Sequence, residues 1–166
     1  MGPEIYKVAN IGRGVLAVMA KPVAGEWIGD EFSGIARYGI TEMVSLLERH
    51  EIRELGLTGA PALCASNGIA FTSFPIADRG LPAAPGVFAL VHEIGRRIAD
   101  GAHTVIHCRA GIGRTGLLAA AVLVRHGHAP EAAFKLVSRA RGVQVPDTAE
   151  QFDWVVQHQQ RLQSTE

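Results

Sequence analysis

Residues 103–126 read HTVIHCRAGIGRTGLLAAAVLVRH, and this stretch decides the fold. Its first part, HTVIHC at 103–108, has the apolar and β-branched composition of a strand. Its last part, from about Thr115 to His126, is so uniformly apolar that it predicts a helix at the centre of the protein. A short glycine-containing segment joins the two. A strand that passes directly into a buried helix indicates an α/β layer fold.

The flanking segments continue this alternation. Upstream, we expect strands over about 5–9 and 14–21 that form a hairpin or sheet edge, followed by a helix that is capped by Asp30 and runs through Tyr38. An apolar run over 40–47 and a polar helix over 48–55 come next. They are followed by a short helix over 58–67, a strand over 69–76 and an amphipathic helix over 87–99. Downstream, we expect helices over about 130–141 and 148–163. The sequence therefore predicts one α/β domain over residues 1–166, with a short, mostly parallel central sheet flanked by helices and a helical C-terminal third.

The composition argues against several classes of function. Lysine plus arginine and aspartate plus glutamate each total 16, and no run of four basic residues occurs, so we expect no nucleic-acid partner. Two cysteines, Cys64 and Cys108, are too few for a disulfide framework, and no CxxC or HExxH spacing offers a metal site. The apolar stretch 15–20 is too short for a membrane span or a secretory leader. We therefore expect a cytoplasmic protein that uses no membrane, metal or other cofactor.

The segment HCRAGIGRTG, residues 107–116, leaves a strand and enters a helix, so its backbone amides should converge at a helix N-terminus. A cysteine there lies in positive potential, which favours the nucleophilic thiolate form of Cys108. Arg114 can offer two parallel N–H donors to two phosphate oxygens. Thr115 can donate its hydroxyl to the sulfur, and His107 can fix the loop by hydrogen bonding and add to the positive field. These residues predict a phosphate-binding loop with a cysteine nucleophile.

HCRAGIGRTG also resembles the HCxxGxxR(S/T) signature of the protein tyrosine and dual-specificity phosphatases, and every defining position is matched. This resemblance implies that Cys108 attacks phosphorus and forms a cysteinyl-phosphate intermediate. It further implies that the phosphate is held by the loop residues Arg109, Ala110, Gly111, Ile112, Gly113 and Arg114. The short chain is similar to the compact dual-specificity type, which has a shallow site.

The same resemblance implies a general acid on a loop upstream of the signature. FPIADRG, residues 74–80, supplies Asp78 for this role, and Asp147 is the alternative acid. The segment GVQVPDTAEQ resembles the family's glutamine-bearing loop, which orients the hydrolytic water. We expect Gln151 in that position, with Gln144 as the alternative.

The function expected is metal-independent hydrolysis of phosphotyrosine, and also of phosphoserine and phosphothreonine, by a monomer acting on a phosphorylated protein or a small phosphomonoester. Alternatives are a phosphatase of phosphoinositides or other small molecules and a non-catalytic relative that only binds phosphate. Arsenate reduction would need further relay thiols, and Cys64 is the only other cysteine; we expect it to pack in the core rather than to pair with Cys108. Gly111, Gly113 and Gly116 also fit a dinucleotide-binding pattern, but no acidic residue ends a second strand after it.

Overall fold

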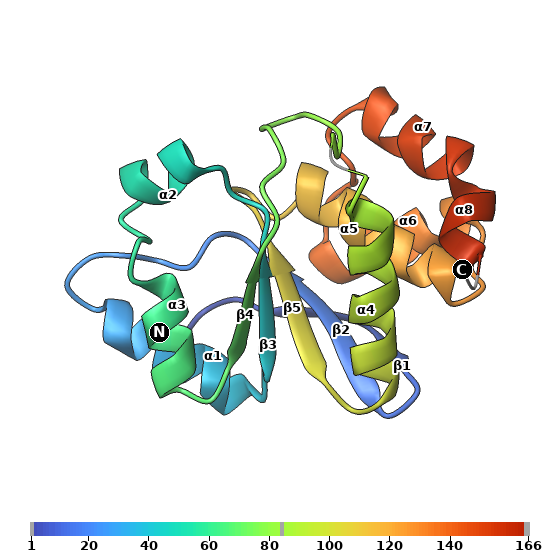
Figure 1. Cartoon of the computed structure of the whole chain (residues 1–166). Helices are drawn as coiled ribbons and strands as arrows, with labels where there is room; N and C mark the ends of the chain where they lie inside the picture. Colours follow the sequence, from blue (N-terminus) through green and yellow to red (C-terminus); the bar gives the residue numbers. More distant parts are fainter. Residues whose placement is uncertain (1, 84, 165–166) are drawn as a thin grey trace.

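A five-stranded sheet forms the centre of the computed structural model, which describes residues 2–83 and 85–164 (Figure 1). Its strands are β1 (Tyr6–Ile11), β2 (Gly14–Met19), β3 (Glu42–Ser45), β4 (Ala70–Ser73) and β5 (His103–His107). The strand order is β1-β2-β5-β3-β4. β1 pairs antiparallel with β2, and all other neighbours are parallel. The predicted α/β fold with a mostly parallel sheet is therefore confirmed.

The central strand β5 ends at the same level as its two neighbours in the sheet. Its neighbours end level with it, because His107 pairs with Met19 of β2 on one side and with Ser45 of β3 on the other. Residues that follow these three strands, Cys108 among them, consequently lie along one edge of the sheet. In an open α/β sheet this carboxyl edge is where ligands bind.

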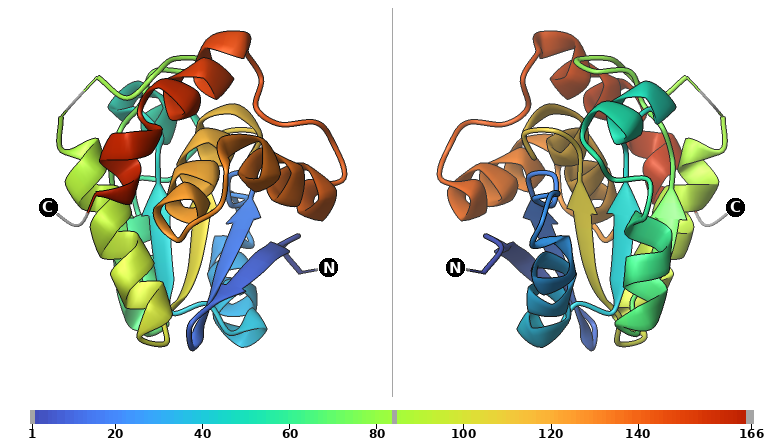
Figure 2. Two further views of the ribbon diagram at one scale, coloured as in Figure 1. Left: turned by 90° about the vertical axis from the view of Figure 1, so that its right-hand side faces the viewer. Right: turned by 90° about the vertical axis from the view of Figure 1, so that its left-hand side faces the viewer.

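Helices cover both faces of the sheet. They are α1 (Ile28–Tyr38), α2 (Arg49–Glu54), α3 (Ala60–Ser66), α4 (Val87–Ala99), α5 (Gly113–Arg125), α6 (Pro130–Arg141), α7 (Ala149–Gln157) and α8 (Gln159–Gln163). Helices α1 and α3 lie on one face, and α4 to α8 lie on the other (Figures 1 and 2). Among the described residues, no helix is long and apolar enough to cross a membrane.

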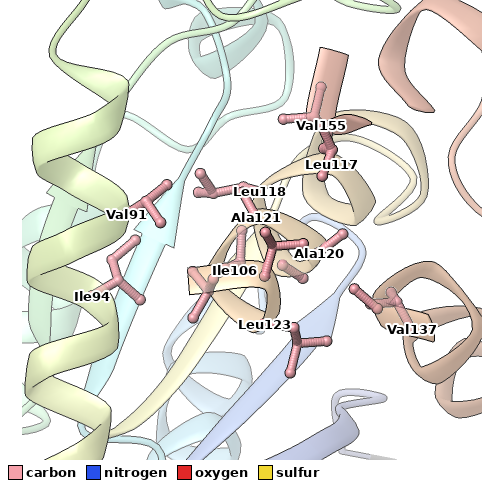
Figure 3. Packing of buried hydrophobic residues seen from close by; sticks show 14 of the residues in the cluster. Val91, Ile94, Ile106, Leu117, Leu118, Ala120, Ala121, Leu123, Val137 and Val155 are labelled. Carbon is pink, nitrogen blue, oxygen red and sulfur yellow. The ribbon is translucent and has the colours of Figure 1, made fainter. Parts of the chain in front are cut away.

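α5 is the helix around which the larger core is built. Every residue from Gly113 to Val124 is buried, so this helix has no solvent face. Side chains from α4, α6, α7 and β5 surround it, and Figure 3 shows Val91, Ile94, Ile106, Val137 and Val155 packed toward it. Each buried side chain of this size contributes roughly 1.5–3 kcal/mol, so the helix and its N-terminus are firmly placed.

The largest differences from the sequence predictions lie in three elements. The predicted helix over 148–163 is two helices, because His158 has φ −103° and ψ 13° and its ring packs on Trp154 at 4.4 Å. Asp30 does not cap α1; the capping position is Trp27, without a side-chain cap, and Asp30 lies in the first turn. β4 ends at Ser73, before the residues that were predicted to complete the strand.

The early end of β4 has a local cause. Proline has no N–H, so Pro75 cannot take part in a ladder of hydrogen bonds. Its neighbours still bond to the chain that follows β3: the Phe74 amide donates to Ser45 O at 2.9 Å, and the Ile76 amide donates to Leu46 O at 3.0 Å. The chain then turns away as an irregular loop, which passes over the carboxyl edge of the sheet (Figure 1).

Candidate active site

The candidate active site is a pocket of about 200 Å³ at the carboxyl edge of the sheet. Its lining residues are Asp78, Arg79, Cys108, Arg109, Ala110, Gly113, Arg114 and Asp147. They come from three segments that are far apart in the sequence: the loop after β4, the loop between β5 and α5, and the segment before α7. The structure thus places the expected nucleophile, the expected arginine and both candidate acids around one pocket.

The loop between β5 and α5 is held by its carbonyl groups. The Lys21 amide donates to Arg109 O at 3.1 Å, and Arg141 donates from Nη2 to Ala110 O at 2.8 Å. Because a trans peptide unit points its N–H away from its carbonyl, the amides of Ala110 and Gly111 face the opposite side from these partners. Gly111 has φ 73°, and a Cβ there would lie 2.5 Å from Met19 O, so the tight course of the loop requires glycine.

Cys108 lies at the inner end of this pocket. Its residue surface is 3% exposed, and it belongs to the core cluster on the α4 to α8 side of the sheet. The N-terminus of α5, which is 13 residues long, begins five positions later at Gly113. Unpaired amides at a helix N-terminus attract anions, so this position suits both a thiolate and a bound phosphate.

Arg114 is buried and is fixed by Glu51 of α2. Its Nη1 donates to Glu51 Oε1 at 2.7 Å and its Nη2 donates to Glu51 Oε2 at 3.0 Å, which is a bidentate pair. Nη1 also donates to Ile76 O at 2.9 Å. Both side chains of the pair are 1% exposed. Glu51 therefore fixes the orientation of the guanidinium, and Arg114 also lines the pocket.

Glu51 was not predicted as a site residue. Burial would raise the pKa of its carboxyl group, but hydrogen bonds from Arg114 and from the Glu48 amide outweigh burial and lower the pKa to about 2. Glu51 also binds the neighbouring loop arginine, with Arg109 Nε at 3.4 Å. Glu54 lies 3.5 Å from Arg109 Nη2. In the sequence, Glu51 looked like part of a polar helical stretch; in the structure, Glu48 and Glu51 form a reciprocal capping pair at the start of α2.

Asp78 lies at the outer side of the pocket, with its side chain 59% exposed. Its Oδ1 accepts a hydrogen bond from Arg114 Nη2 at 3.2 Å. The loop that carries it is fixed at Ile76, whose amide donates to Leu46 O just after β3 and whose carbonyl accepts from Arg114 of α5. Asp147 lies on another side of the same pocket, where a Cβ added to Gly113 would be 2.6 Å from Asp147 Oδ2. Both carboxylates thus have access to the pocket, and Asp78 is the one in contact with the arginine.

His107 and Thr115 are both buried close to the loop. The Nδ1 atom of His107 lies 3.1 Å from Cys108 O, so the side chain does contact the loop. Burial lowers the pKa of His107 to about 4, so the ring is neutral near pH 7 and does not add a positive charge. Thr115 is fully buried, and its Oγ1 has no hydrogen-bond partner among the described residues. Its donation to the sulfur stays a prediction.

The two candidate glutamines have different surroundings. Gln144 is exposed and lines a groove between α6 and α7. Gln151 is fully buried: its Oε1 accepts from the amides of Asp147 at 3.1 Å and Thr148 at 3.2 Å, and its Nε2 donates to Gly80 O at 3.2 Å. The amide of Gln151 therefore connects the start of α7 to the loop that carries Asp78. Its predicted action on a water molecule remains untested.

Cys64 lies in the other core cluster, on the α1 and α3 side of the sheet. It is fully buried, its Sγ is 3.9 Å from Met43 Sδ, and burial raises its pKa to about 11. A thiol with these properties is poorly suited to exchange with Cys108. The packing role expected of Cys64 agrees with this environment.

Comparison with known families adds a decisive observation. A family described as "Tc-R-P: Polymorphic toxin system, DSP-PTPase phosphatase" matches residues 17–128, which include Asp78 and the whole loop from Cys108 to Arg114. The chain belongs to this family of DSP-PTPase phosphatases. The expected relationship to the protein tyrosine and dual-specificity phosphatases is thus confirmed.

Two curated relatives of this chain are about one quarter identical to it in sequence. Cyclin-dependent kinase inhibitor 3 of mouse is 25% identical over 126 residues, which cover 75% of this chain and 60% of the mouse protein. The human protein of the same name is 26% identical over 75% of this chain and 59% of its own length. This chain therefore aligns with about three fifths of the length of these relatives.

Solved structures agree with the fold over nearly the whole chain. Kinase associated phosphatase, crystallised with its catalytic-site cysteine replaced by serine, gives a TM-score of 0.87 at 21% identity and covers 100% of this chain and 99% of that one. Tk-PTP in its active form gives 0.76 at 24% identity, with 94% and 97% covered. At this identity the likeness shows that the DSP-PTPase member described here has the fold of these phosphatases.

Proposed function

We propose that this chain is a metal-independent phosphomonoester hydrolase that acts on phosphotyrosine, and also on phosphoserine and phosphothreonine, through a cysteinyl-phosphate intermediate. Family membership supports this class of reaction. The single observation that carries the proposal is that Cys108, Arg114 and Asp78 line one pocket at the carboxyl edge of the sheet. A nucleophile, an anion-binding group and a proton donor are the three parts that such a reaction needs.

In the first step, the thiolate of Cys108 attacks phosphorus and the bond from phosphorus to the ester oxygen breaks. The loop amides and Arg114 bind the equatorial oxygens, where charge concentrates in the transition state. Protonated Asp78 gives its proton to the departing oxygen, which leaves as an alcohol or a phenol.

In the second step, water attacks phosphorus and the bond from phosphorus to sulfur breaks. The carboxylate of Asp78 accepts a proton from the water, and the thiolate of Cys108 is regenerated. Thr115 is proposed to donate its hydroxyl to the departing sulfur. Gln151 is proposed to act by holding the loop of Asp78, because its own amide is bonded to Gly80 O and to the start of α7.

The size and charge of the pocket favour a phosphorylated protein as substrate. At about 200 Å³ the pocket holds a phosphoryl group and little of the group that carries it, so both aryl and alkyl esters have access. Ala110 and Ile112 bring no charge into the loop, which disfavours substrates with several ring phosphates. We further propose that the chain acts as a monomer in the cytoplasm, where a free nucleophilic thiol stays reduced.

The test is hydrolysis of para-nitrophenyl phosphate in the presence of a metal chelator. Wild type should turn the substrate over and vanadate should inhibit it, because vanadate mimics the trigonal transition state. Cys108→Ser should lose turnover by more than about a thousandfold, whereas the control Cys64→Ala should retain it. Turnover by folded Cys108→Ser close to that of wild type, or no turnover by freshly reduced wild type, would refute the proposal.

A further inference from the structure

The loop that carries Asp78 contains a residue in an unfavourable backbone conformation. The Gly80 amide donates to Ala77 O at 2.7 Å, which closes a four-residue turn with Asp78 and Arg79 at its centre. Arg79 has φ 58°, and it is the one non-glycine residue with positive φ in the described part of the chain. Glycine or asparagine normally occupies this position of a turn. Arginine in this conformation strains the backbone, because its Cβ crowds the neighbouring peptide group.

The side chain of Arg79 is also the uncompensated arginine of the pocket. Arg109 is paired with Glu51 and Glu54, and Arg114 is paired with Glu51 and Asp78. Arg79 lines the same pocket and has no ion pair or hydrogen bond with any described residue. Backbone strain is often found at ligand-binding sites. A strained arginine without an intramolecular partner is therefore a candidate for binding a ligand.

The pocket continues into a longer groove, which indicates what kind of molecule that partner is. Asp147 lines both the catalytic pocket and a groove of about 1150 Å³ between α6 and α7. The titratable residues of the groove balance, with Lys135 and Arg139 against Glu131 and Asp147. An extended chain can lie across both, whereas a small phosphate ester would fill the catalytic pocket alone. Within the catalytic pocket itself, Arg79 is the arginine that no acidic side chain of the described residues pairs with.

We propose that Arg79 binds a side-chain carboxylate of a phosphopeptide, one or two residues from the phosphorylated residue, so that acidic phosphopeptides are the preferred substrates. This inference rests on the proposed function, because it assumes that the phosphoryl group sits in the loop from Cys108 to Arg114. The strain at Arg79 then has a purpose: it holds the guanidinium beside the phosphate site and away from the acids that bind Arg109 and Arg114.

The experiment uses phosphotyrosine peptides that differ at one flanking position, glutamate against glutamine, tested on each side of the phosphotyrosine. Binding is measured by fluorescence anisotropy with the Cys108→Ser protein, which needs no turnover, and kcat/KM is measured with the otherwise wild-type enzyme. We expect the glutamate peptide to bind roughly fivefold more tightly than the glutamine peptide at low salt, and the preference to shrink as salt is added.

Three substitutions separate charge from backbone conformation. Arg79→Gly and Arg79→Asn remove the charge and suit the turn, so both should abolish the preference for glutamate. Arg79→Lys keeps a positive charge and the strained turn, so it should retain most of the preference. Arg79→Gly should also raise the unfolding temperature, which shows that the turn itself persists.

The outcomes are distinguishable from failure of the proposed function. If the wild-type protein does not hydrolyse para-nitrophenyl phosphate, the proposed function fails. The ratio of the affinities for the glutamate and glutamine peptides tests the role of Arg79 separately. An equal affinity for both peptides, or a preference that survives in Arg79→Gly, would overturn the inference. Binding of an inositol polyphosphate that depends on Arg79 more strongly than peptide binding does would also overturn it.

Discussion

At the scale of single residues, Arg114 combines two requirements that usually conflict. Its side chain is 1% exposed, yet it must reach a ligand. Glu51 balances the buried charge through two hydrogen bonds, and Ile76 O takes a further N–H. Asp78 accepts from Nη2, on the side that faces the pocket. The guanidinium is thus neutralised by Glu51, a buried partner, and also contacts Asp78, an exposed partner that we propose phosphate displaces.

Glu51→Gln should show how much this permanent partner contributes. Removal of one charge from a buried pair leaves the other poorly compensated, so the free energy of unfolding should fall by about 3 kcal/mol. A misplaced Arg114 should also lower kcat/KM by roughly a hundredfold. Urea unfolding and para-nitrophenyl phosphate hydrolysis measure the two effects. Glu54→Gln is the matched control, because Glu54 is exposed and bonds to Arg109 alone; equal effects of the two changes would contradict this account.

The contact between Asp78 Oδ1 and Arg114 Nη2 occupies a donor that binds phosphate in the proposed mechanism. In the Cys108→Ser background, Asp78→Asn should therefore bind inorganic phosphate roughly two- to fivefold more tightly, since the competing charge at a partly exposed position is removed. Isothermal titration calorimetry measures the affinity. An unchanged or weaker affinity would mean that the contact between Asp78 and Arg114 does not oppose ligand binding.

At the scale of elements, the start of α7 is coupled to the acid-bearing loop through one buried side chain. Thr148 and Gln151 form a reciprocal capping pair, in which Thr148 Oγ1 accepts from the Gln151 amide at 3.1 Å. The side-chain amide of Gln151 donates from Nε2 to Gly80 O at 3.2 Å. Gly80 closes the turn that contains Asp78. Gln151 therefore stabilises both the start of α7 and this turn.

Substitutions at the two capping residues should separate these roles. Thr148→Ala removes only the cap and should cost about 1 kcal/mol of unfolding free energy. Gln151→Leu leaves two amides and the Gly80 carbonyl without their partner, so it should cost about 2–3 kcal/mol and speed hydrogen exchange in residues 74–83. Exchange in that loop that stays as slow as in wild type would show that Gln151 does not support it.

How far the sequence predicts such elements depends on whether the deciding contacts are local. α4 and α6 have the bounds that were predicted, because an amphipathic period and clear end signals lie within each segment. At the break between α7 and α8, by contrast, the His158 ring contacts Phe88 of α4, which is far away in the sequence. Like α4 and α6, the loop from Cys108 to Arg114 could be predicted, because its residues are contiguous and their spacing identifies them. Glu51 was missed because it meets Arg114 across 63 positions of sequence, and only the folded sheet brings the two together.

At the scale of the whole molecule, the site makes the fold sensitive to acid. Burial lowers the pKa of His107 from 6.5 to about 4, so between these pH values the unfolded chain binds a proton that the folded chain does not. The stability that this neutral ring supports is complete above pH 6.5 and is lost as pH falls toward 4. Glu51 acts in a lower window, because its pKa of about 2 lies below the ordinary 4.5.

The free energy of unfolding should therefore decrease by about 3 kcal/mol from His107 alone between pH 6.5 and pH 4. Urea titrations at several pH values across this range measure it. His107→Gln should flatten the slope by that amount, while other groups with a shifted pKa, such as His126, contribute equally to both proteins. Parallel pH profiles for the two proteins would contradict the assignment.

The strand order also has a consequence for how the chain acquires its reactivity. β5 is the last strand in sequence but the middle strand in space, and it joins the β1–β2 pair to the β3–β4 pair. Until it inserts, the sheet is two separate pieces, and pairing β2 with β5 closes a loop that joins Val15 to His103. Such non-local pairing is a slow step of folding. Since Cys108 follows this strand directly, it meets Glu51, the partner of Arg114, and the loop that carries Asp78 only when the sheet is complete. The proposed active site is therefore absent from a nascent or partly unfolded chain, and it forms when β5 joins the two pieces of the sheet.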